Sequence, residues 1–89
     1  AEGAAVAVLD LAEALAAEGA FRGSTALPCD VADEAQVEAG LQAAAGALGG
    51  LDLVVANAGL VPPWRETDAL DLAEWDRVMA VNVRGVAAT

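Results

Sequence analysis

The stretch AAVAVLD, residues 4–10, decides the fold, because an unbroken aliphatic run ends there in a single carboxylate. Such a run is typical of a strand that is covered on both faces, as strands are in parallel sheets flanked by helices. The sequence therefore predicts a strand over residues 4–9. Asp10 and Glu13 have the spacing of a helix-capping pair, so a helix is expected to follow at once and to end at Gly19.

The same order of elements repeats further along the chain. A short strand is predicted over residues 25–28, and Asp33 with Gln36 predicts the start of a longer helix. That helix is expected to close at the glycine pair 49–50. Its apolar stripe consists of Val37, Leu41, Ala44, Ala45 and Leu48.

A third strand and a third helix complete the pattern. The hydrophobic segment LVVA, residues 53–56, predicts the strand, and residues 60–70, with two prolines, predict a loop. Asp71 with Glu74 predicts the start of a helix that continues to about Val86. Strands that alternate with helices predict an α/β fold, in which a parallel sheet carries helices on both faces and residues 1–89 belong to one domain.

The composition excludes several classes of partner. Apolar residues make up 57% of the chain and aromatic residues 3%, which suits helices packed on a sheet. The net charge of −10 would repel a phosphate backbone, so nucleic acid is not an expected partner. No window reaches the roughly 20 uninterrupted apolar residues of a membrane span, and no basic segment precedes an apolar one. We therefore expect a protein of the cytoplasm that binds no membrane.

Several residue types that carry chemistry are absent. The chain contains no His, Tyr or Lys, and its only serine is Ser24, so it holds no complete acid–base or nucleophilic set. Cys29 has no partner cysteine or histidine, so neither a disulfide nor a metal site is predicted. Cys29 is expected to be a small buried apolar residue.

Polar residues end all three predicted strands, namely Asp10, Asp30 and Asn57. In open parallel sheets, ligands bind beyond the carboxyl ends of the strands. A carboxylate at the position of Asp10 accepts hydrogen bonds from the adenosine ribose of a dinucleotide and repels a 2′-phosphate. No basic residue follows closely, so NAD is predicted in preference to NADP, although Asp10 is also a plausible helix cap.

The other two strand ends also predict contacts with a cofactor. The Asp30 carboxylate can accept from the adenine amino group and the backbone of Val31 can reach the ring, with an Asx turn as the alternative. Asn57, Ala58 and Gly59 form a turn of small residues, called here the 57–59 turn. Its asparagine can bridge neighbouring strands, its alanine leaves room for a flat ring, and its glycine allows positive φ or a close approach. An ordinary turn is the alternative.

Asn82 is a polar residue on the apolar face of the last predicted helix, four residues after Val78 and four before Val86. A buried amide without partners costs about 1–3 kcal/mol, so this residue needs a structural or a catalytic role. Two possibilities stay open: an amide satisfied by local backbone near Gly85, or a residue of an active site. Trp75, on the same helix, is expected in the core.

Taken in order, four segments resemble the short-chain dehydrogenase/reductase family. They are AVAVLD at 5–10, CDV at 29–31, GGLDLVVANAG at 49–59 and WDRVMAVNVRG at 75–85. The resemblance implies a Rossmann-type, doubly wound parallel sheet of which this chain supplies strands 2, 3 and 4 with their helices. It also implies that Asp10 is the NAD-selecting acid and that Asp30 and Val31 contact adenine. The 57–59 turn would then stabilise the central sheet beside the cofactor.

The resemblance further implies catalytic and quaternary roles. Asn82 aligns with the catalytic asparagine of the family, which supports a kinked helix and a water of the proton relay. The expected activity is NAD(P)-dependent interconversion of an alcohol and a ketone or aldehyde, on a small-molecule carbonyl or alcohol substrate. The expected assembly is a homodimer or homotetramer formed through the helix 71–89.

The family's glycine-rich loop and its Ser, Tyr and Lys have no counterparts within residues 1–89, so we expect an internal piece of a dinucleotide-binding domain. In the Rossmann strand order the predicted strand 53–56 then lacks its neighbour, and the peptide alone is not expected to form a native-like domain. Two alternatives stay open. One is a non-catalytic, nucleotide-sensing Rossmann domain. The other is an S-adenosylmethionine-dependent methyltransferase, which Pro62-Pro63-Trp64 faintly suggests but which leaves Asn82 and Gly85 unexplained.

Overall fold

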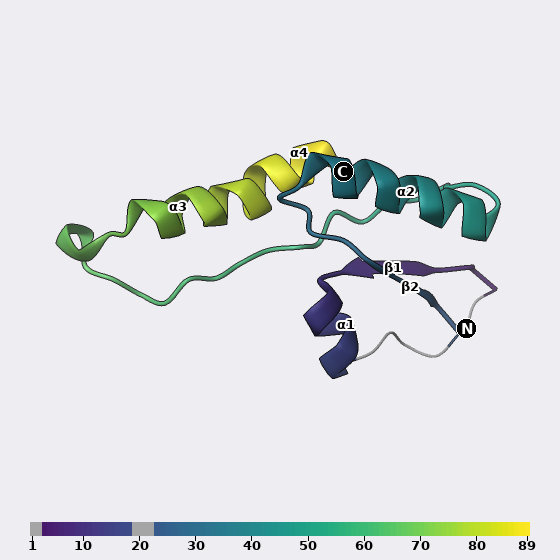
Figure 1. The fold of residues 1–89 in the computed structure, drawn as a ribbon, viewed down its shortest axis with the longest axis horizontal. Helices are drawn as coiled ribbons and strands as arrows, with labels where there is room; N and C mark the ends of the chain where they lie inside the picture. Colours follow the sequence, from purple (N-terminus) through teal and green to yellow (C-terminus); the bar gives the residue numbers. More distant parts are fainter. Residues whose placement is uncertain (1–2, 19–22) are drawn as a thin grey trace.

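A computed structural model of the chain describes residues 3–18 and 23–89, with four α-helices and two strands in the described part (Figure 1). The elements of the first half are β1 (Ala7–Asp10), α1 (Ala12–Glu18), β2 (Thr25–Pro28) and α2 (Glu34–Leu48). Those of the second half are η1 (Thr67–Ala69), α3 (Leu72–Met79), η2 (Ala80–Arg84) and α4 (Gly85–Ala88). None of the described helices is long and apolar enough to cross a bilayer.

β1 and β2 form a parallel pair, which confirms the predicted orientation. Ala7 pairs with Thr25 and Asp10 with Pro28, so both strands end at the same edge. β2 covers the predicted residues, whereas β1 starts later than predicted and includes Asp10. The ladder starts where Thr25, the first residue of β2, pairs with Ala7 and donates its N–H to the Val6 carbonyl at 2.9 Å.

Helices α1 and α2 both pack on β2, and in Figure 1 α2 lies above the two strands while α1 lies below them. The core lies under α2, where Cys29, Val37 and Ala44 are buried. The predicted apolar stripe of α2 and the buried cysteine are thereby confirmed. Burial raises the pKa of the Cys29 thiol, and the nearby Asp30 and Asp33 carboxylates raise it further.

The caps of α2 are those that the sequence predicts. Asp33 Oδ1 accepts from the N–H groups of Ala35 at 3.0 Å and Gln36 at 3.3 Å, and the Gln36 amide donates to Asp33 Oδ2 at 3.2 Å. Gly49 ends the helix in the left-handed conformation, with φ of 81°. The predicted end of α1 at Gly19 lies outside the described residues.

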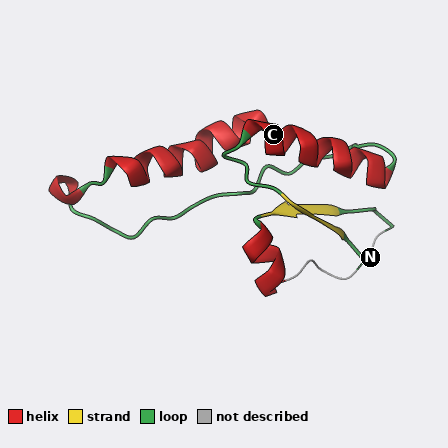
Figure 2. Ribbon diagram, in the orientation of Figure 1, coloured by secondary structure: helices red, strands yellow, loops and turns green. Residues whose placement is uncertain are grey.

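The predicted third strand is wrong: residues 53–56 pair with no described strand and lie in the long loop drawn in green between α2 and α3 (Figure 2). Leu53 is 81% exposed and Val55 is 74% exposed. A strand is stable only when a neighbour satisfies its backbone N–H and C=O groups, and no described segment offers that neighbour here.

The last predicted helix is present, and a π-helical turn separates its two α-helical parts. Asp71 Oδ1 accepts from Ala73 N–H at 2.9 Å, which confirms the predicted cap, and the helical segment extends to Ala88. Within it, η2 is a π-helical turn in which the Gly85 N–H donates to the Ala80 carbonyl, five residues back. π-turns of this kind are frequent at functional sites. Trp75 is 52% exposed, so its expected place in the core is wrong, because α3 extends away from the sheet.

Two buried helical glycines lead to different predictions for substitution by alanine. A Cβ at Gly85 would lie 2.9 Å from Val31 Cγ2 and 3.2 Å from the Ala80 carbonyl, whereas one at Gly40 would meet the flexible end of Leu9 at 2.9 Å. In the whole protein we expect Gly85→Ala to destabilise by about 1–3 kcal/mol, because a β-branched side chain and a backbone oxygen give way poorly. We expect Gly40→Ala to be closer to neutral, since the helix gains about 1 kcal/mol.

Denaturant unfolding of both variants checks this prediction. Gly46→Ala serves as the control, because a Cβ there meets nothing within 4 Å. Equal stability of the Gly85 and Gly46 variants would contradict the close packing of Gly85 on Val31.

Candidate functional site

Two of the predicted site residues lie together at the carboxyl edge of the sheet. Asp10 is the last residue of β1 and Asp30 follows β2 by two residues. Asp10 is exposed, and its Oδ1 accepts from the Leu11 N–H at 2.8 Å, directly before α1. The carboxylate therefore supports the start of the helix and still faces solvent, so it can also accept hydrogen bonds from a ligand.

Asp30 shapes the turn that leads into α2. Its Oδ1 accepts from the Ala32 N–H at 3.0 Å, and its carbonyl accepts from the Asp33 N–H at 3.0 Å. Its own N–H donates to Gln36 Oε1 at 2.9 Å. The Asx turn that the sequence allowed is thus formed, and the hydrogen bonds of Asp30 fix the backbone conformation around Val31.

Asn82 is satisfied by a distant segment. Its Oδ1 accepts from the Leu60 N–H at 2.7 Å, and its Nδ2 donates to the Leu60 carbonyl at 2.8 Å. The expectation of local backbone near Gly85 is wrong, because the partner lies 22 residues earlier in the chain. The Asn82 side chain pairs with both the N–H and the C=O of Leu60, as the backbone of a neighbouring strand would. It therefore attaches the loop that begins at Leu60 to η2.

Residues 57–59 lie beside this attachment but form neither a turn nor a bend in the structure, so the turn predicted from their sequence is wrong. A Cβ at Gly59 would lie 3.5 Å from Asn82 Oδ1, and Gly59 is not among the described glycines with positive φ. Asn57 is exposed, and its side chain makes no hydrogen bond to any residue of the described ranges. The expected bridge between neighbouring strands is not formed, since no described strand lies on either side.

The turn η2 also contacts the segment after β2. Arg84 Nη2 donates to the Ala32 carbonyl, and the buried Gly85 packs against Val31. The residues that directly follow the two segments with predicted cofactor contacts are therefore both bound by η2, Ala32 through Arg84 and Leu60 through Asn82. Sequence reasoning missed Arg84 and Leu60. Arg84 has no local signal in the sequence, because an isolated arginine on a helix usually faces solvent. Leu60 has none either, because it takes part through its backbone N–H and C=O groups.

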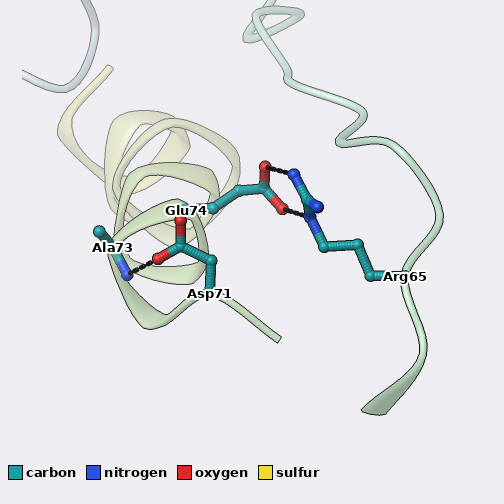
Figure 3. A network of polar contacts seen from close by, with 4 residues as sticks. All are labelled: Arg65, Asp71, Ala73 and Glu74. Atoms are coloured by element: carbon teal, nitrogen blue, oxygen red, sulfur yellow. Dashed lines mark hydrogen bonds and ion pairs between the residues drawn. The ribbon is translucent and has the colours of Figure 1, made fainter. Parts of the chain in front are cut away.

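A bidentate ion pair attaches the loop 60–70 to α3 (Figure 3). Arg65 Nε lies 3.0 Å from Glu74 Oε1 and Arg65 Nη2 lies 3.2 Å from Glu74 Oε2. The hydrogen bond to Glu74 raises the pKa of Arg65, and the charge of the carboxylate raises it further. Asp71 is therefore the capping residue of α3, whereas the expected capping partner, Glu74, pairs with the loop instead.

Comparison with known proteins gives concordant results. A family model described as enoyl-(acyl carrier protein) reductase matches residues 1–89. The chain is 39% identical over 90 residues to short-chain dehydrogenase reductase 5 of Arabidopsis thaliana, covering 97% of the chain and 35% of that protein. It is 41% identical over 93 residues to D-threitol dehydrogenase of Mycolicibacterium smegmatis, covering 94% of the chain and 34% of that protein.

Solved structures show the same likeness. The 3-ketoacyl-(acyl-carrier-protein) reductase from Brucella melitensis, complexed with NADH, matches with a TM-score of 0.86 and 34% identity, over 97% of this chain and 37% of that one. Levodione reductase matches with a TM-score of 0.82 and 35% identity, over 98% of this chain and 37% of that one. The chain has the fold of the corresponding part of these Rossmann-type proteins and spans about a third of their length.

Proposed function

This chain belongs to the short-chain dehydrogenase/reductase family, and we propose on that basis that the whole protein is an NAD(P)-dependent oxidoreductase that interconverts an alcohol and a ketone or aldehyde. The observation that carries the proposal is the sheet edge where Asp10 lies next to the Asp30–Val31 turn, in a chain that superposes on an NADH-bound reductase. Residues 1–89 would form part of one dinucleotide-binding domain, and the proposed compartment is the cytoplasm.

The residues at this edge fit the adenosine half of a nicotinamide cofactor. The exposed Asp10 carboxylate would accept from the ribose hydroxyls, while Asp30 and Val31 would contact the adenine. Residues 57–59 would lie beside the cofactor further along the edge. NAD is favoured, because Asp10 would repel a 2′-phosphate and the next basic residue along the chain is Arg22. The bound cofactor supplies or accepts the hydride.

Asn82 would belong to the catalytic set as a positioning residue. Both polar atoms of its side chain are used by Leu60, so the side chain holds the loop and leaves little for direct contact with substrate. It lies within the π-helical turn η2, and such turns displace main-chain carbonyls from the regular α-helical ladder. A carbonyl freed in this way could accept a hydrogen bond from the water of a proton relay.

The proposed substrate is a small molecule with a carbonyl or alcohol group, and the proposed assembly is a homodimer or homotetramer through residues 71–89. The exposed apolar residues of this segment support the assembly, because they recur at helical spacing along one stripe. They are Leu72, Trp75, Met79, Val83 and Val86.

A pair of assays tests the proposed function. The whole protein is titrated with NADH and with S-adenosylmethionine, and NADH formation from added NAD+ is then followed with a panel of small alcohols. Binding of NADH together with turnover supports the oxidoreductase. Binding without turnover across the panel would favour a nucleotide sensor, and binding of S-adenosylmethionine alone would favour a methyltransferase.

The choice between NAD and NADP leads to a prediction about Asp10. Asp10→Asn keeps an oxygen that can accept from the Leu11 N–H but removes the charge. We expect the ratio of kcat/KM for NADP to that for NAD to rise about 10- to 100-fold, the range that charge-assisted hydrogen bonds of about 1.5–3 kcal/mol imply. Asp76→Asn removes the same charge from an exposed position on α3 and should leave the ratio unchanged. An unaltered ratio in the Asp10 variant would remove this residue from the proposed site.

A further inference from the structure

The peptide groups of Ala32 are held from two sides. The Asp30 carboxylate accepts from the Ala32 N–H at 3.0 Å, and the Arg84 guanidinium donates to the Ala32 carbonyl. Ala32 directly follows Asp30 and Val31, which carry the proposed contacts with adenine. Movement of the Ala32 carbonyl would therefore also move the backbone of Asp30 and Val31.

A second contact joins the same two segments. Gly85, next to Arg84, is buried, and a Cβ at this position would lie 2.9 Å from Val31 Cγ2. Two consecutive residues at the junction of η2 and α4 thus contact two consecutive residues of the turn after β2. The packing of Gly85 sets the distance between the segments, and the hydrogen bond from Arg84 sets the direction of the turn.

We propose that Arg84 is a positioning residue for the adenine-binding turn, acting through the Ala32 carbonyl and not on the cofactor itself. The proposal rests on the proposed function. Asn82, two residues earlier in η2, holds Leu60. One π-helical turn therefore sets the spacing between the adenine side of the site and residues 57–59.

The acceptor on Ala32 is a neutral carbonyl, so the contribution of Arg84 comes from a directed hydrogen bond rather than from its field on the cofactor phosphates. One consequence distinguishes these possibilities: the effect of removing Arg84 should persist at high salt, which screens an exposed charge. Lys should restore the affinity under either possibility, because it keeps both a donor and the charge at the end of a long side chain.

The test uses the whole protein with ADP-ribose as the probe. Arg84→Met keeps the length of the side chain and removes the donor and the charge. We expect its Kd for ADP-ribose to rise about three- to ten-fold, the change that the loss of one hydrogen bond produces, with Tm nearly unchanged. Arg84→Lys should recover most of the affinity. Arg77→Met removes an equal charge from α3 and should bind ADP-ribose like the wild type.

Several outcomes would overturn the proposal. An unchanged Kd for ADP-ribose in Arg84→Met would show that the hydrogen bond to Ala32 does not hold the turn in its binding conformation. A loss of affinity that Arg84→Lys does not restore would show the same. A loss that disappears at high salt would mean that Arg84 acts on the phosphates through its charge. A wild-type protein that binds neither NADH nor ADP-ribose would contradict the proposed function itself, and this result is distinct from the others. If Arg84→Met fails to fold, Arg84→Ala takes its place, with the same expected rise in Kd and the same result that would overturn the proposal.

Discussion

The 89-residue chain expressed alone is expected to unfold without a cooperative transition. Its described residues bury only three apolar side chains, those of Cys29, Val37 and Ala44, and its sheet has two strands. Its radius of gyration is 15.0 Å, against about 12 Å for a compact domain of this length. A two-stranded sheet with so small a core cannot offset the entropy lost on folding.

Circular dichroism at increasing temperature checks this expectation. The chain alone should give a broad, sloping change in the far-UV signal and no near-UV band from its tryptophans, because Trp64 is 81% exposed and Trp75 is 52% exposed. The whole protein, measured in the same buffer, should show a sigmoidal transition. A sharp transition with a folded near-UV spectrum in the chain alone would contradict the expectation.

The second large effect is expected at Asn82. In the whole protein, Asn82→Ala should lower turnover on the order of 100-fold, because a small displacement of the loop it holds misplaces reacting groups. Stability should fall by about 1–3 kcal/mol, since the partly buried polar groups of Leu60 lose both partners. Steady-state kinetics and denaturant unfolding measure the two effects separately.

An isosteric variant makes the prediction about Asn82 sharper. In Asn82→Asp one carboxylate oxygen can still accept from the Leu60 N–H, but the other would face the Leu60 carbonyl at the 2.8 Å now occupied by a donor. Two acceptors at that distance repel, so this variant should be at least as impaired as the alanine variant. Gln42→Ala is the control, because it removes an exposed amide on α2 whose partner is Glu38, 3.5 Å away. Wild-type turnover in Asn82→Asp would show that the reciprocal pairing is dispensable.

The elements of the first half were predictable because their signals are local. β2 needs only a short aliphatic run between turn residues, and the start of α2 is set by Asp33 and Gln36, three residues apart. The position of Asp10 and Asp30 at one edge follows from the parallel pairing of β1 and β2, which the alternation of strands and helices predicts. The start of α2 depends on interactions within a few residues of the chain, whereas the common edge follows from the regular alternation of strands and helices.

The predicted strand at residues 53–56 shows the limit of structure prediction from local sequence. Its composition suits a buried strand, yet Leu53 and Val55 are exposed and no described segment pairs with them. Hydrophobic pattern tells which segments could be strands, whereas formation of a strand requires a neighbour in space. The predicted burial of Trp75 is wrong for the same reason, because burial depends on what packs against α3 and not on the helix itself.

The sequence by itself determined the order of β1, α1, β2, α2 and the last helix, the N-caps Asp33 and Asp71, and the acidic edge that begins at Asp10. Only the tertiary structure showed that Asn82 pairs with Leu60, that Arg84 reaches Ala32, and that residues 53–56 form no ladder with a described strand. The hydrogen-bond partners lie 22 and 52 residues apart in the chain. Periodicity and capping act over one or two helical turns, so contacts over such separations arise only when whole elements pack together.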